Sequence, residues 1–128
     1  MWALAIFLLL AIQDTDKERM MKVQADQWLA LVDAGDYGKA YDALSESTRK
    51  ELPRAEFVKT TEELRDYVGK PQMRKFKSVE FVTNPPGPPE GEYSAVQYET
   101  AFQNRPVTEA VAFRLEDGKW GVIGYYMR

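Results

Sequence analysis

The chain has 128 residues, of which 45% are hydrophobic and 12% aromatic, and a formal net charge of −3. This size and composition suit one globular domain with its own core. The sequence contains no cysteine and no histidine, which excludes disulfides, thiolate metal sites and the commonest general base near neutral pH. The acidic balance and the lack of a basic block argue against nucleic-acid binding. We expect no metal or cofactor, because no ligand spacing or phosphate loop is present.

An uninterrupted apolar run, MWALAIFLLLAI, occupies residues 1–12. Twelve residues are too few to span a bilayer, which needs about 20, but they suit the hydrophobic region of an export signal. An uncleaved anchor at the membrane surface and a buried first helix are the alternatives. We therefore predict an export signal or anchor over residues 1–13 and a single domain over 14–128. An exported chain would be periplasmic or belong to the cell envelope.

Helical spacing dominates the first half of this domain. Apolar residues recur every three or four positions over 16–34 and 37–44, and Gly35 separates the two runs. A third helix is predicted to begin near Pro53 and to end at Gly69, with a further turn or two before it. The side chains expected to face the core from the third helix are Phe57, Thr61, Leu64 and Val68.

After this helix the hydrophobic period changes to two, which is typical of β-strands. The predicted strands are 74–83, 93–103, 106–116 and 119–127. The Pro/Gly-rich segment NPPGPPEG lies between the first two and cannot join a sheet ladder. We expect it to be a connector, and a polyproline ligand for a partner is the alternative.

A tight turn at Asp117-Gly118 sets the register of the last two predicted strands. This dipeptide favours a two-residue hairpin of type I′, which pairs Glu116 with Lys119. Counting along the strands then places Glu109 opposite Tyr126. Residues directly opposite in an antiparallel pair share one face of the sheet, so Glu109 and Tyr126 are predicted to lie together.

The Asn104-Arg105 pair sets a second register by the same logic. It places Phe102 opposite Val107 and Thr100 opposite Glu109. The two registers are independent, yet both select the same apolar face, which supports a meander. The predicted inward face consists of Val96, Tyr98, Thr100, Phe102, Val107, Glu109, Val111, Phe113, Leu115, Trp120, Val122 and Tyr126.

The opposite face of the predicted sheet is small and apolar on the last two strands. A contiguous apolar surface of this kind indicates self-association or a partner, the alternative being a lightly hydrophobic solvent face. The candidate interface residues are Ala110, Ala112, Ile123, Tyr125 and Met127.

Glu109 is the one charged residue in the predicted inward row. A buried carboxylate is costly unless it is hydrogen-bonded or reaches water. On one interpretation Thr100, Glu109 and Tyr126 line a pocket, and burial raises the pKa of Glu109 so that it can accept a proton or anchor a ligand. On the other interpretation Glu109 is structural and pairs with a nearby Arg or Lys.

Three stretches of the sequence resemble the bacterial family called domain of unknown function 4019. They are residues 28–37, residues 91–93 with 96–100, and residues 117–120 with 124–128. The resemblance covers about residues 20–128, although Tyr41 and Phe57 stand where members often carry Trp. It implies an exported bacterial protein with a cone-like fold similar to cystatin-like and nuclear-transport-factor-2-like domains. It implies no activity, and no catalytic residue can be carried over from it.

Together these features predict an α+β domain in which three N-terminal helices pack on a curved, four-stranded antiparallel β-meander. The favoured function is a non-catalytic binding or assembly module of the cell envelope, either a homodimer or bound to an envelope protein. Membrane contact is expected only through residues 1–12, if they are not cleaved. The alternative is a small pocket enzyme that uses a buried carboxylate for proton transfer or hydrolysis.

Overall fold

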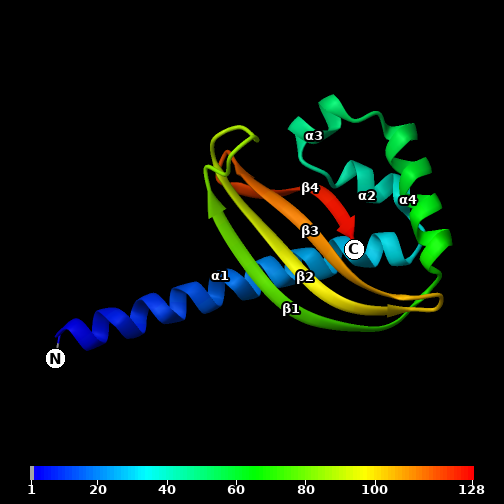
Figure 1. Cartoon of the computed structure of the whole chain (residues 1–128). Helices are drawn as coiled ribbons and strands as arrows, with labels where there is room; N and C mark the ends of the chain where they lie inside the picture. Colours follow the sequence, from blue (N-terminus) through cyan, green and yellow to red (C-terminus); the bar gives the residue numbers. More distant parts are fainter. Residues whose placement is uncertain (1) are drawn as a thin grey trace.

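A computed structural model describes the backbone of residues 2–128 and the side chains from Thr15 onward. Within this range the chain forms four helices followed by one four-stranded sheet, which confirms the predicted α+β class (Figure 1). The elements are α1 (Trp2–Asp33), α2 (Tyr37–Asp42), α3 (Glu46–Glu51), α4 (Arg54–Val68), β1 (Pro71–Thr83), β2 (Glu92–Phe102), β3 (Pro106–Glu116) and β4 (Lys119–Met127).

The sheet is an antiparallel meander with strand order β1-β2-β3-β4, as predicted. In Figure 1 α1 crosses one face of the curved sheet, and α2, α3 and α4 gather beside β4. The first strand begins at Pro71, earlier than predicted; a proline is tolerated there because it is the first residue of an edge strand.

The predicted export segment, residues 1–13, lies outside the part of the chain whose side chains are described. The backbone of α1 passes through it to Asp33 without a break. Among the described residues, no helix combines the length and apolarity needed to cross a membrane.

Local signals explain most helix boundaries. Gly35 and Gly69 adopt left-handed φ values of 78° and 81° and end α1 and α4, as expected for glycine after a helix. A fourth helix, α3, forms because Ser45 caps it: its Oγ accepts a hydrogen bond from the Thr48 N–H at 3.3 Å. Asp36 occupies the N-cap position of α2 but makes no such bond.

The core lies between the helices and the inward face of the sheet. Its centre includes Met21, Trp28 and Leu29 of α1 together with Tyr98 and Phe113 of the sheet, all nearly or fully buried. The predicted face of α4 is confirmed in part. Phe57, Thr61 and Val68 are buried there, whereas Leu64 is half-buried and the charged Arg65 is buried in its place.

The register between β2 and β3 differs by two residues from the predicted one. Thr100 lies opposite Val107, and the Phe102 N–H donates to the Arg105 carbonyl at 3.0 Å, so the two-residue turn lies at Gln103-Asn104, one position earlier than predicted. The turn is held in this position because the backbone N–H groups of Gln103 and Asn104 donate to the carbonyls of Lys70 and Val68, at the end of α4 and just after it. An even shift keeps every side chain on its predicted face, so the inward residues of both strands remain buried, apart from the half-buried Leu115.

The β3–β4 hairpin starts in the predicted register, and Asp117 and Gly118 have the positive φ values of a type I′ turn. Ile123 then has no partner on β3, so the ladder contains a β-bulge. Beyond this bulge Tyr125 lies opposite Val111 and Tyr126 lies opposite Ala110. The prediction that Tyr126 points inward is therefore wrong: Tyr126 is 59% exposed, and Tyr125 faces the core instead.

Candidate functional site

A fully buried carboxylate, Glu109 of β3, is held from three sides. Arg74 of β1 binds it bidentately, with Nε at 2.7 Å from Oε1 and Nη2 at 3.2 Å from Oε2. Thr100 of β2 donates a hydrogen bond to Oε1 at 2.5 Å, and the Tyr125 hydroxyl donates to Oε2. The predicted contact between Thr100 and Glu109 is thus present, although the two residues are not directly opposite in the ladder.

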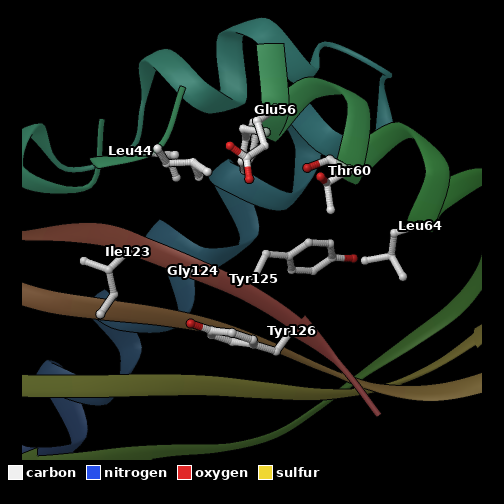
Figure 2. A pocket seen from close by; sticks show the side chains of 11 residues that line it. Leu44, Glu56, Thr60, Leu64, Ile123, Gly124, Tyr125 and Tyr126 are labelled. Atoms are coloured by element: carbon white, nitrogen blue, oxygen red, sulfur yellow. The ribbon is translucent and has the colours of Figure 1, made fainter. Parts of the chain in front are cut away.

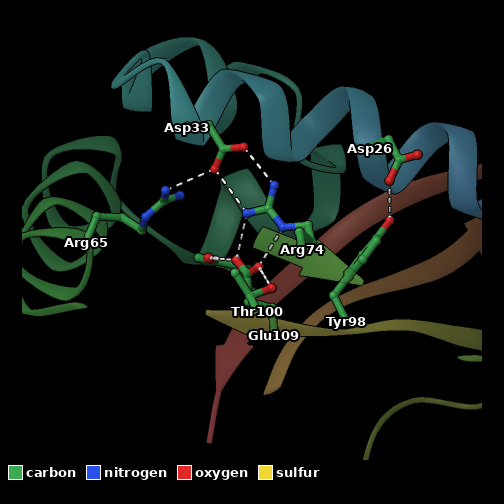
Figure 3. A network of polar contacts seen from close by, with 8 residues as sticks. Asp26, Asp33, Arg65, Arg74, Tyr98, Thr100 and Glu109 are labelled. Atoms are coloured by element: carbon green, nitrogen blue, oxygen red, sulfur yellow. Dashed lines mark hydrogen bonds and ion pairs between the residues drawn. The ribbon is translucent and has the colours of Figure 1, made fainter. Parts of the chain in front are cut away.

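Arg74 links this carboxylate to the helical layer (Figure 3). Its Nη1 and Nη2 also bind Asp33 of α1, at 2.7 and 3.1 Å. Asp33 in turn accepts a hydrogen bond from Nη2 of Arg65 on α4 at 2.9 Å. We call Arg65, Asp33, Arg74 and Glu109 the buried ion network, after its buried ends Arg65 and Glu109; Arg74 is half-buried, and Asp33 is partly exposed. The network's two positive and two negative charges balance, which is how a fold can bury ionised groups.

The network perturbs the ionisation of its own members. Burial alone would raise the pKa of Asp33, but hydrogen bonds and charges from Arg74 and Arg65 hold that pKa below its ordinary value. Burial likewise disfavours the charged form of Arg74, but Asp33 and Glu109 outweigh it and raise the pKa of this guanidinium. Both groups therefore stay ionised around neutral pH.

Tyr125 takes the place that the sequence analysis gave to Tyr126. The bulge at Ile123 turns its ring inward, where it stacks edge-on against Trp28 with ring centroids 5.4 Å apart. Burial and the neighbouring charge of Glu109 raise the pKa of the Tyr125 hydroxyl, so it remains a neutral donor. The polar cluster that the structure forms is therefore Thr100, Glu109 and Tyr125.

This geometry suits a structural carboxylate better than a catalytic one. Both oxygens of Glu109 already accept hydrogen bonds, and its charge is matched by Arg74. A general base needs an oxygen within reach of a substrate proton, whereas Glu109 is 0% exposed. Among the described residues, no three carboxylates lie close enough together to hold a metal ion.

A hollow of about 280 Å³ opens between α4 and β4, on the other side of Tyr125 (Figure 2). We call it the α4–β4 hollow. Its surface is mainly apolar, with hydroxyl groups and one carboxylate at its border. The residues that line it are Leu44, Leu52, Glu56, Phe57, Thr60, Thr61, Leu64, Ile123, Gly124, Tyr125 and Tyr126.

Tyr125 connects the hollow to the buried ion network. In Figure 2 its ring points toward α4, while Tyr126 leaves β4 in the opposite direction. The indole of Trp28, fixed by a hydrogen bond from Nε1 to the Ala40 carbonyl at 3.0 Å, supports both Tyr125 and Phe57 from behind. Glu109 therefore acts on the hollow indirectly, by fixing the orientation of one wall.

The family model for a protein of unknown function (DUF4019) matches residues 24–125. This match covers most of the chain and all of the sheet except its last residues. The chain belongs to the DUF4019 family. A search of curated proteins gave no match.

The predicted interface of this DUF4019 domain is divided by the bulge. Ala110 and Ala112 lie on the outer face of the sheet, opposite Tyr126 and Gly124. Tyr125 and Met127 instead face inward, the latter against a small cluster with Val68. Ile123 lines the α4–β4 hollow. The five residues consequently do not form one outer patch.

Sequence reasoning found Glu109 and its partner Thr100 in the DUF4019 domain but missed Arg74, Asp33 and Tyr125. Arg74 lies in a weakly patterned strand, 35 positions away in the chain. Asp33 occupies the last residue of α1, where an acidic side chain opposes the helix dipole. That unfavourable placement is the one local signal that could have singled out Asp33.

Proposed function

We propose that this chain is a non-catalytic binding module of the bacterial cell envelope that takes up an apolar group in the α4–β4 hollow. The observation that carries the proposal is the combination of an open, mainly apolar hollow with ion pairs that neutralise Arg65 and Glu109, the buried charges among the described residues. Binding needs shape and apolar surface, which the hollow supplies. Acid–base chemistry needs an accessible titratable group, and Glu109 is not accessible.

The same proposal includes the finer description of the fold and the location. The curved antiparallel sheet with helices against it is compatible with a cystatin-like or nuclear-transport-factor-2-like cone. Residues 1–12 are proposed to direct export, or to remain as an anchor at the membrane surface. If the segment directs export, the domain would act outside the cytoplasm.

Binding in the hollow can be tested with the neutral fluorescent probe N-phenyl-1-naphthylamine. Thr60→Trp places a bulky ring at the border of the hollow, and Glu63→Trp places the same ring on an exposed part of α4 that does not line it. We expect at least a tenfold loss of affinity for Thr60→Trp and none for Glu63→Trp. All forms carry the same apolar N-terminus, so binding of the probe there would be equal in all of them. Equal affinities would therefore place the probe outside the hollow and refute the proposal.

Export can be tested with alkaline phosphatase fused after Arg128, because this reporter is active only outside the cytoplasm. We expect activity in a bacterial host and its loss when Leu8 and Leu9 are both replaced by Arg, which interrupts the apolar run. Replacing both by Ile keeps the run apolar and serves as the control. A fusion that is inactive with the natural sequence would contradict export.

A further inference from the structure

β4 is an edge strand, and part of its outer edge is free. Thr108 and Arg128 exchange two backbone hydrogen bonds, at 2.8 and 3.1 Å. Because such reciprocal pairs alternate along an antiparallel ladder, the backbone groups of Tyr125 and Met127 point away from β3. No hydrogen bond within the described part of the chain uses these outward groups. A row of unpaired N–H and C=O groups is a template for another strand.

The chain already pairs with this edge just before the free part, at Val122. Leu44 forms an isolated parallel bridge with Val122, and the Ser45 N–H donates to the Val122 carbonyl at 2.8 Å. Ser45 then caps α3, so the chain turns away from β4. The edge thus accepts a strand-like segment up to Val122 and is vacated where the bulge at Ile123 begins.

The free edge runs along the α4–β4 hollow, since Ile123, Gly124, Tyr125 and Tyr126 all line it. At about 280 Å³ the hollow is slightly smaller than the roughly 300–1,000 Å³ of typical ligand pockets. It therefore suits one or two apolar side chains of an extended segment. Strand addition combines both features, because main-chain hydrogen bonds supply affinity and pockets select side chains.

Charge further limits the chemistry of the segment. Glu56 is the charged residue among those that line the hollow, and it is exposed. Among the described residues none forms an ion pair with it. A carboxylate at the border of an apolar hollow favours a ligand that carries a positive charge beside its apolar group.

We propose that the β4 edge and the α4–β4 hollow bind an extended peptide segment as a short fifth strand, with an apolar residue in the hollow and a Lys or Arg two positions away, on the same face of the strand, near Glu56. This inference rests on the proposed binding function and names the class of ligand. The backbone groups of Tyr125 and Met127 would supply the hydrogen bonds.

The test uses the full chain and the probe peptide acetyl-Val-Leu-Val-Lys-amide, in which Leu and Lys share one face of the strand, followed by amide NMR. We expect saturable shifts of the Tyr125 and Met127 amide signals at millimolar peptide, with slower hydrogen exchange at both. N-methylation of alternate peptide amides should abolish these shifts for one set of amides and spare them for the other, because alternate amides of a strand face opposite sides.

The charge contact is tested separately. Replacing Lys of the peptide by Glu, or Glu56 by Gln in the protein, should weaken binding at least threefold, and Glu63→Gln on the same helix should not. Equal binding by both N-methylated peptides would overturn strand addition. Unchanged binding after both charge substitutions, or equal weakening by Glu63→Gln, would overturn the contact with Glu56. If the naphthylamine probe binds the hollow but the peptide does not, this inference fails and the proposed function stands; if neither binds, both fail.

Discussion

Removing the Arg74 guanidinium is the most direct test of the buried ion network. Arg74→Met keeps much of the side-chain length but deletes two hydrogen bonds to Glu109 and two to Asp33. Glu109 is fully buried and would keep only the hydroxyl donors, whereas Asp33 would keep Arg65. Breaking a buried ion pair from one side typically costs about 3–5 kcal/mol. Since domains are stable by only about 5–15 kcal/mol, this is a large fraction of the total.

The free energy of unfolding can be measured by urea titration, followed by the fluorescence of the buried Trp28 and the half-buried Trp120. Arg54→Met is the matched control, because Arg54 forms an ion pair with Asp42 in which both side chains are more than half exposed. Such surface pairs contribute only about 0–1 kcal/mol.

A double variant separates the unpaired charge from lost packing. Adding Glu109→Gln to Arg74→Met removes the uncompensated negative charge while keeping the size of the side chain. We expect the double variant to be more stable than Arg74→Met alone, which is the signature of coupling between the two groups. The reasoning is refuted if Arg74→Met costs no more than Arg54→Met, or if the second substitution adds to the loss.

Three further predictions concern Tyr125, Asp33 and the packing of Gly121 against Ser45. Tyr125→Phe should destabilise the fold by about 1–3 kcal/mol, because it removes a hydrogen-bond donor from a buried carboxylate. The control Tyr126→Phe should leave the urea midpoint unchanged, and equal effects of the two substitutions would contradict the bulge. Burial would raise the pKa of Asp33, but two arginines hold it below its ordinary value of 3.8. The unfolded chain therefore binds more protons, so stability should fall as the pH drops below about 4, and less steeply in Asp33→Asn. Gly121→Ala would place a Cβ 2.9 Å from the Ser45 Cβ and 3.3 Å from its Cα. We expect the free energy of unfolding to fall by about 1–3 kcal/mol and the Ser45 amide to exchange faster. Unchanged exchange would count against that packing.

Much of the architecture could be predicted because it depends on neighbouring residues. The ends of β3 and β4 coincide with the predicted ones at 106, 116, 119 and 127. Asp117-Gly118 fixes the hairpin between them through its own positive φ angles. The alternation of apolar residues along each strand likewise identified the buried face of β2 and β3, including the buried Glu109.

The turn after β2 shows where local reasoning stops. Asn104-Arg105 is compatible with a two-residue turn, but Gln103 and Asn104 bond to the connection between α4 and β1. That connection is distant in sequence, so the register could not be predicted from the turn alone. The two-residue difference in register left each side chain on its predicted face, because side chains alternate with a period of two.

The sequence by itself determined the class of fold, the order of the strands and the presence of one charge in the core. Tertiary structure decided the rest of the site: which tyrosine binds Glu109, which arginine neutralises it and where the hollow lies. The bulge at Ile123 occurs beside the bridge between Leu44 and Val122. A bulge moves the following side chains to the opposite face of the sheet, and nothing in the residues of the strand itself indicates this. Hydrophobic periodicity reports only on a strand and its own two faces, whereas the pairing of buried charges depends on segments that meet after the chain has folded.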